Sequence, residues 1–406
     1  MNQTVHDNKN LSLWMLYIIV FYCLQYTFFP GLTTRVITQI MLFLVLLIVF
    51  SIKFNHIKQI KFEGKNYLIS FLFYSIIIYI YSIFISKSYE QWRYLIADYT
   101  PVLLLPVIGI ISSGSYSPIY QVRTLIKYIT LLSLFNLLNK DLGKIENVHF
   151  VDFMSYNYLL ILFLPYFKFK YKIIIIAISI ATVLLNLDNR SNIIFTIISF
   201  LIMSIYYVPY LLQISKTLRK LLQYIPIVLF LLGILGIVNI FQYLENEFIY
   251  NYSTGISEIN ITTDSRTSIY LDAIDNLNEN NAWIWGTGVT NIYKTRISEG
   301  FEGYDKGRMG ASESGFLNLI SFGGFIYVII FFLIILKSSY LAIYRSNNKI
   351  SKLLGIFVSF AWFFIFIEIP IGFKMVWYIF FISIGICLNP NFRGLNDAKI
   401  KLYLNR

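Results

Sequence analysis

Cysteine, histidine and charged residues are all scarce in this sequence of 406 residues. It has 2 cysteines and 3 histidines, and charged residues make up only 13% of it. Cys23 and Cys387 both fall in apolar runs and are too far apart for a paired metal or redox motif. The low charge, with 57% hydrophobic residues and a mean hydropathy of +0.66, excludes an ordinary soluble domain. It predicts an all-α polytopic membrane protein.

The sequence shows no internal repeat, and we expect no cleavable leader. The second half of the chain does not mirror the first, which argues against a transporter built from inverted repeats. The first 30 residues carry little charge before the apolar run and have no small-residue cleavage site, so we expect an uncleaved first span rather than a signal peptide.

Long apolar runs dominate what is there. A membrane-spanning helix needs about 20 predominantly apolar residues, and twelve segments meet this condition, three of them (101–113, 125–138 and 156–167) being short. The predicted spans are 11–29, 35–52, 67–85, 101–113, 125–138, 156–167, 173–187, 192–212, 224–243, 315–336, 353–369 and 375–388.

The basic residues alternate from loop to loop. With the N-terminus placed in the cytoplasm, 21 of the 33 lysines and arginines fall on the cytoplasmic side, and 18 of the 21 acidic residues fall on the external side. Cytoplasmic loops are enriched in Lys and Arg. The distribution of the net charge of +12 therefore indicates the orientation of the chain in the membrane and does not indicate a nucleic-acid partner. Both termini are predicted to be cytoplasmic.

One long polar segment interrupts the apolar sequence and organises it. Residues 243–313 hold 11 of the 21 acidic residues but only 5 of the 33 basic ones. The charge pattern puts this segment outside the cell. We divide the chain into spans 1 to 9 (1–243), a large external loop (244–313), and spans 10 to 12 with a cytoplasmic tail (314–406).

The first part of this external loop has the pattern of an amphipathic helix. Thr263 or Asp264 is a suitable N-cap, and apolar residues at helical spacing continue to about Asn278. Such a helix would place Arg266 in its first turn, with its apolar face resting on the membrane surface or on the spans below.

The rest of the external loop is rich in glycine. Gly286 and Gly288 predict a chain reversal, and the four glycines of 299–310, a segment that includes Arg308, suggest a mobile lid. Glu313 stands at the entrance to the tenth span. Inside that span, Gly323 and Gly324 predict close packing or a bend.

Three shorter external segments also carry polar residues. Residues 87–100 form an amphipathic stretch that we expect in the membrane interface. His149, in 139–155, is the one external histidine, and a solvated role is expected for it. Arg190 is pinned between two apolar spans, where its guanidinium suits bidentate binding of a phosphate group.

These motifs together resemble a known family. The pattern consists of Asp-Asn-Arg190-Ser at the end of one span, Asp-Ser-Arg266 followed by an amphipathic helix and a Trp-Gly-Thr-Gly turn, and Ser-Glu313-Ser-Gly entering the next span. It resembles the O-antigen polymerases and O-antigen ligases. The resemblance runs from about residue 188 to 336, through short motifs.

The resemblance implies glycosyl transfer on the external face of a bacterial inner membrane. The donor would be a glycan on a polyprenyl (undecaprenyl) diphosphate, and the acceptor a lipid-linked repeat unit. Arg190, Arg266 and Arg308 would bind the diphosphate and stabilise its developing charge. Glu313 is the first candidate for the general base and Asp264 the second.

No metal site and no cofactor are expected, because no external cluster has metal-ligand spacing. The expected partners are the lipid-linked oligosaccharides, membrane lipids and, as a further candidate, a protein that regulates chain length. A nucleic-acid partner is not expected.

Several alternatives stay open on the sequence. Ligases of this superfamily have a histidine late in the long loop, and here that loop has none, which favours a polymerase. A flippase or transporter would explain the hydropathy but does not need so long a loop. A different multi-span glycosyltransferase would be expected to have acidic residues in its first external loop, 30–34, which has none. The sugars, their linkage and the type of polymer, O-antigen or capsule, are also open.

Overall fold

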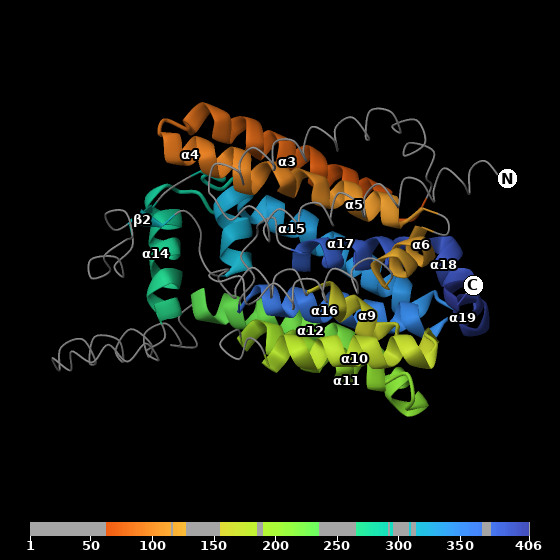
Figure 1. Cartoon of the computed structure of the whole chain (residues 1–406). Coiled ribbons are helices and arrows are strands. Elements are labelled where there is room, and N and C mark those ends of the chain that lie inside the picture. Colours follow the sequence, from red (N-terminus) through yellow and green to blue (C-terminus); the bar gives the residue numbers. More distant parts are fainter. Residues whose placement is uncertain are drawn as a thin grey trace, which may run out of the picture.

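A computed structural model describes residues 62–114, 117–126, 155–184, 190–234, 265–290, 293–294, 308–309, 314–367 and 375–405. The described elements are almost entirely helical (Figure 1). The longest helices are α3 (Lys65–Ile85), α12 (Pro209–Ile234) and α15 (Gly315–Tyr344). Two short strands, β1 (Tyr293–Lys294) and β2 (Arg308–Met309), pair antiparallel.

The other helices are shorter. They are α4 (Tyr89–Tyr94), α5 (Leu105–Ser112), α6 (Ser117–Thr124), α9 (Tyr156–Leu162), α10 (Phe169–Leu184), α11 (Arg190–Ser204), α14 (Ser265–Glu279), α16 (Lys349–Ile365), α17 (Met375–Leu388), α18 (Pro390–Gly394) and α19 (Asp397–Asn405). A π-helix at Leu95–Tyr99 and 3₁₀ turns at Thr100–Leu104 and Leu164–Tyr166 complete the set.

Most of these helices run along one long axis, and α14 lies across one end (Figure 1). We call this the α14 end and the opposite one the α19 end. At the α19 end, hydrogen bonds tie the C-terminal segment to the turns between helices: Asn389 Nδ2 donates to Gly114 O at 2.7 Å, and Lys168 N donates to Asn405 Oδ1 at 3.1 Å. Asp397 accepts from Lys349 N at 2.9 Å.

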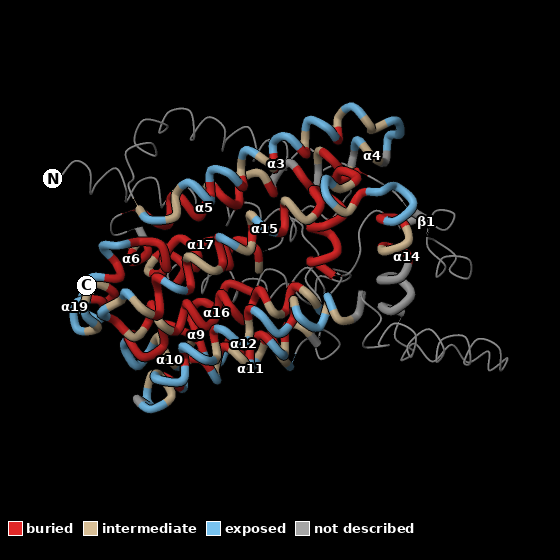
Figure 2. The backbone as a smooth tube through the Cα atoms, turned by 180° about the vertical axis from the view of Figure 1, so that it is seen from behind, coloured by how far each residue is buried: buried red, intermediate tan, exposed pale blue. Residues whose placement is uncertain are grey.

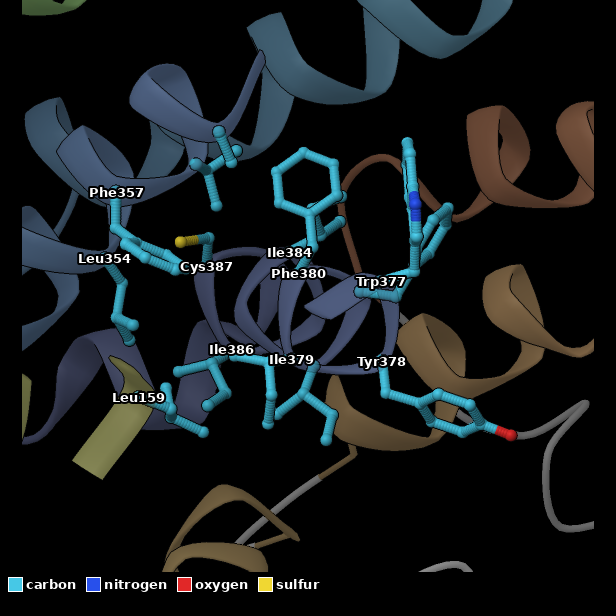
Figure 3. Close-up of a cluster of buried hydrophobic side chains, with 14 of the residues drawn as sticks. Leu159, Leu354, Phe357, Trp377, Tyr378, Ile379, Phe380, Ile384, Ile386 and Cys387 are labelled. Carbon is cyan, nitrogen blue, oxygen red and sulfur yellow. The ribbon is translucent and has the colours of Figure 1, made fainter. Parts of the chain in front are cut away.

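The middle of the bundle is built around α17 (Figures 2 and 3). Its residues are apolar on every side, as expected for a fully surrounded helix, and the large side chains Trp377, Phe380 and Phe381 are buried. Gly385 allows close contact with α5, because a Cβ there would come within 2.4 Å of Gly109 O. Residues 155–167, which include α9, are buried without exception.

The outer helices show the opposite arrangement, with apolar side chains outside and small polar ones inside. Helix α3 exposes Phe73 and Phe84 but buries Ser75 and Ser82. Helices α10, α11 and α12 repeat the pattern. Their exposed residues include Ile180, Ile197 and Val228, and their buried ones include Ser179, Ser199 and Gln223.

Two helices in the described part of the chain, Lys65–Ile85 and Gly315–Tyr344, are long and apolar enough to cross a membrane. Shorter apolar helices lie at Val102–Ser112, Ser191–Ser204 and Val376–Leu388. The predicted all-α class therefore agrees with the structure, and a membrane location is suggested. The predicted spans 11–29 and 35–52 lie outside the described residues.

Some predicted boundaries were wrong. The span predicted at 192–212 is two helices, since α11 ends at Ser204 and α12 begins at Pro209. Proline has no N–H to donate and is accommodated at the start of a helix. The basic segment 213–223, predicted as a loop, is part of α12. The span predicted at 101–113 is broken into a 3₁₀ turn and α5, with Pro101 and Pro106 at their starts.

Candidate functional site at the α14 end

Helix α14 forms as the sequence predicts and packs on the bundle. It begins at Ser265, directly after Asp264, and Arg266 lies in its first turn. Ala273 and Leu277 are fully buried, and Ala273 clusters with Leu317 of α15 and Phe230 of α12. The apolar face therefore rests on the helices below, which was one of the two predicted arrangements.

The C-terminus of α14 ends in a Schellman-type turn. Asn281 has a positive φ of 49°, Ala282 N donates to Leu277 O at 2.9 Å and Asn281 N donates to Asn278 O at 3.1 Å. Helix α14 thus ends at Glu279, one residue past the end near Asn278 that the sequence predicts. The turn directs residues 282–290, which we call the docking loop, back toward α15.

Helix α15 is interrupted where the docking loop meets it. Gly324 has φ 67° and ψ −170°, a conformation open essentially only to glycine. Beside this break, Thr287 N donates to Ser321 O at 2.6 Å and Phe325 N donates to Trp283 O at 2.8 Å. The kink frees backbone groups of α15, and the docking loop binds them. The bend predicted from Gly323 and Gly324 is therefore present.

Gly286 and Gly288 make the chain reversal that the sequence predicts. Both have positive φ, 74° and 83°. A Cβ on Gly286 would lie 2.5 Å from Gly323 N, and one on Gly288 would lie 3.0 Å from Ser82 Oγ. These glycines are needed for their left-handed conformation and for the closeness of the two backbones.

The other side of the docking loop is bound to α3 and α4. Val289 N donates to Ser82 Oγ at 2.9 Å, Ser86 Oγ donates to Thr290 Oγ1 at 3.0 Å, and Gln91 Nε2 donates to Thr290 O at 3.1 Å. Gln91 also completes a capping box with Ser88 at the start of α4. Sequence reasoning missed this clamp, although Ser75 and Ser82 of α3 and Ser86, which directly follows the helix, recur at helical spacing.

The tip of the docking loop is apolar and exposed. Trp283 stacks on Phe325 with ring centroids 5.6 Å apart, and its Nε1 donates to Asn278 Oδ1 at 2.8 Å. Ile284 and Trp285 are instead 57% and 68% exposed. A rigid backbone thus presents two large apolar side chains at the α14 end.

The predicted arginines lie on elements that converge at this end. Helix α14, which carries Arg266, contacts β1, and β1 pairs with β2 so that Lys294 lies opposite Arg308. Arg190 is the first residue of α11. The conformations of these three arginine side chains are outside what the structure describes. The described residues do not include Glu313, Asp264 or His149. Of the predicted lid 299–310 they include only Arg308 and Met309.

Helix α16 packs against both α11, which begins at Arg190, and α15. Phe195 of α11 lies 4.8 Å from Phe364 between ring centroids, and Phe366, just past α16, stacks on Phe316 at 3.9 Å. Ser314, which caps α15 and directly follows Glu313, donates to Phe366 O at 3.2 Å. The start of α11 and the start of α15 are therefore held at the same end of the bundle.

A small cavity lies beneath the docking loop. Its volume is about 20 Å³, and its lining includes Ser75, Tyr99, Val289, Phe322 and Tyr327. This is room for little more than one water molecule. This cavity is therefore too small to hold a sugar or a diphosphate.

Metal-binding groups do not gather in the described ranges: no three His, Cys, Asp or Glu side chains there lie together so as to hold an ion. Comparison of the chain with protein families, with curated proteins and with solved structures gives no match.

Proposed function

We propose that this chain is a polytopic membrane protein whose α14 end faces the outside of the cell. The support comes from the outer helices, which expose Phe73, Phe84 and Val228 and bury serine and glutamine. Such a distribution would be unfavourable in water and favourable in a bilayer. Among the described residues that the charge pattern assigns to the cytoplasm, Lys168 hydrogen-bonds to Asn405 of α19, and Arg345 pairs with Glu63.

We further propose that the protein is a polysaccharide repeat-unit polymerase. It transfers a growing glycan from polyprenyl diphosphate to a lipid-linked repeat unit. The observation that carries this proposal is the meeting of α11, α14, β2 and the start of α15 at one end. Arg190, Arg266 and Arg308 belong to these elements, and Ser314 caps the start of α15.

In the proposed reaction a hydroxyl oxygen of the acceptor sugar attacks the anomeric carbon of the donor. The bond from that carbon to the diphosphate oxygen breaks, and the hydroxyl proton passes to a carboxylate. The arginines stabilise the charge that develops on the diphosphate. Glu313 remains the first candidate for the base, because the sequence makes Asp264 a candidate N-cap of α14, a role that would engage its carboxylate.

A transporter or flippase is the second candidate, and one observation favours it. Buried amides lie inside the bundle at Asn157, Asn192 and Gln223. Two of them donate to serines: Asn157 Nδ2 to Ser179 Oγ at 2.6 Å, and Gln223 Nε2 to Ser339 Oγ at 2.7 Å. Asn192 accepts from the Tyr158 hydroxyl. Such pairing accounts for these residues as interhelical contacts, so we rank transport below polymerisation.

Deletion of the gene distinguishes the candidates. Without a polymerase, single repeat units are still exported and ligated, so the acceptor should carry glycans one unit long. Without a ligase or a flippase, the acceptor should carry none. The glycan ladder on a gel is the measurement, and restoration by the wild-type gene is the control. A normal ladder in the deletion strain would rule out the proposal.

A further inference from the structure

An unpaired arginine lies in the first half of α12, near the α19 end. Arg219 is 7% exposed, and its guanidinium carbon lies 5.6 Å from the Tyr340 ring centroid and 5.3 Å from that of Tyr344. Its Nε is buried without a hydrogen-bond partner. Within the part of the chain that the structure describes, this guanidinium forms neither an ion pair nor a hydrogen bond.

A second cation shares one of these rings. Lys216, one turn earlier on α12, has its Nζ 5.3 Å from the Tyr344 centroid. Aromatic faces attract cations, but two positive charges close to one ring also repel each other. A guanidinium has five N–H donors and no acceptor, and burying a charge without a partner is costly. An anion between the two cations would satisfy both groups.

The surface beside this pair is suited to a lipid. Lys220 is exposed next to Arg219, and α12 then exposes a line of apolar side chains that leads away from the α19 end. This line consists of Leu221, Tyr224, Ile225, Val228 and Leu229. A basic site continuous with an apolar stripe matches a phosphate headgroup with its acyl chains, whereas free phosphate would make no use of the stripe.

We propose that Arg219 and Lys216 bind the headgroup phosphate of an acidic phospholipid whose chains lie along α12. The site rests on the membrane placement proposed above and, in the proposed orientation, belongs to the cytoplasmic leaflet, where basic residues attract anionic lipids. It lies at the opposite end from the candidate polymerase site. Its function is to fix α12 and α15 against the membrane surface, independently of glycan chemistry.

The test measures lipid binding to the full-length chain in detergent, after its own lipids have been removed. Native mass spectrometry should show phosphatidylglycerol bound more tightly than phosphatidylcholine, and excess inorganic phosphate should displace little of it. Arg219→Gln and Lys216→Gln should each weaken phosphatidylglycerol binding about fivefold, the effect of one basic residue near an anionic membrane. Lys216 is exposed, so its variant tests the site even if the Arg219 variant does not fold.

Lys170→Gln is the matched control. Lys170 is exposed and lies 5.0 Å from the Tyr171 ring centroid, so this variant removes an equal charge from an equivalent ring contact at a different place. It should bind phosphatidylglycerol as the wild type does. Equal binding of phosphatidylcholine, full displacement by inorganic phosphate, or an unchanged affinity in Lys216→Gln would each overturn the proposal.

Discussion

The carbonyl oxygen of Ile284 lies 2.0 Å from the point that a Cβ on Gly324 would occupy. The docking loop and the break in α15 are therefore in direct backbone contact. Only a glycine at position 324 leaves room for this contact, and the hydrogen bond from Phe325 N to Trp283 O lies beside it. The loop after α14 is therefore part of the bundle rather than a free external segment. The position of α14, and of Arg266 on it, follows from this contact.

Gly324→Ala should displace the docking loop. The substitution combines a strained backbone conformation, costing about 1–3 kcal/mol, with a clash against Ile284 O. We expect a lower apparent unfolding temperature in detergent and a shorter polymer in cells. Gly394→Ala is the control, because nothing lies within 4 Å of a Cβ there. If both variants unfold at the wild-type temperature, the loop does not depend on the kink.

Ser82→Ala tests the other side of the docking loop. It removes the acceptor of the buried Val289 N–H, and an unsatisfied buried donor costs about 1–3 kcal/mol. Ser82 Oγ also donates to Ile78 O within its own helix. Ser204→Ala removes a comparable intrahelical bond, to Leu201 O, at an exposed site. Thermal unfolding should show a loss for Ser82→Ala and little change for Ser204→Ala.

Much of this arrangement was readable from residue types. A candidate N-cap at Thr263 or Asp264 and apolar spacing as far as about Asn278 predicted the start and end of α14, and the paired glycines predicted the bend in α15. The clamp between Thr290 and Gln91 was not predictable, because it joins residues 199 positions apart in the sequence. The break at Pro209 was missed because the apolar run continues through it. Apolar content alone does not show where a helix ends.

The ion pairs of Glu63 predict how stability at the α19 end depends on pH. Partial burial raises the pKa of Glu63, but the hydrogen bond and charge of Lys337 and the charges of Arg345 and Arg393 lower it more, to a net value below the usual 4.5. A carboxylate with a lowered folded-state pKa contributes stability above its unfolded pKa, and this is lost as pH falls through the folded value. The unfolding temperature should therefore decrease below about pH 4.5.

Glu63→Gln should remove that part of the pH dependence. The variant should unfold at a lower temperature than the wild type at pH 7, and the two should converge as the pH falls below 4.5. Glu279→Gln, at an exposed position in the last turn of α14, is the control and should keep the wild-type profile. Identical profiles for Glu63→Gln and the wild type would show that the pairs with Lys337 and Arg345 contribute nothing.

Exposed positions at the two ends allow the orientation to be tested. In a chain whose Cys23 and Cys387 have been replaced, single cysteines are placed at Trp285 or Tyr89 for the α14 end and at Lys170 for the α19 end. A membrane-impermeant thiol reagent applied to cells with a permeabilised outer membrane should label the first two and spare the third until the inner membrane is opened. The reverse labelling would invert the orientation, and with it the proposed location of the site.

The predicted arginines give the most direct test of the chemistry. If Arg190 and Arg266 bind diphosphate oxygens in pairs, alanine at either position should remove a transition-state contact worth about 2.7–4 kcal/mol, or roughly a hundred- to a thousand-fold in rate. Lysine keeps the charge but loses the planar fork, so it should restore activity only in part. An arginine that merely anchors a helix at the membrane edge should be replaced by lysine without loss.

Arg308 should behave differently if the segment that contains it closes only over bound substrate. Arg308→Ala is then expected to raise KM by a larger factor than it lowers kcat. Arg123→Ala is the control for the loss of an arginine away from the site. Arg123 lies in the last turn of α6, which contacts α19. Polymer length and membrane expression are measured for each variant. Full-length polymer from both Arg190→Ala and Arg266→Ala at normal expression would exclude these two arginines from the site and leave the leaving group without its proposed stabilisation.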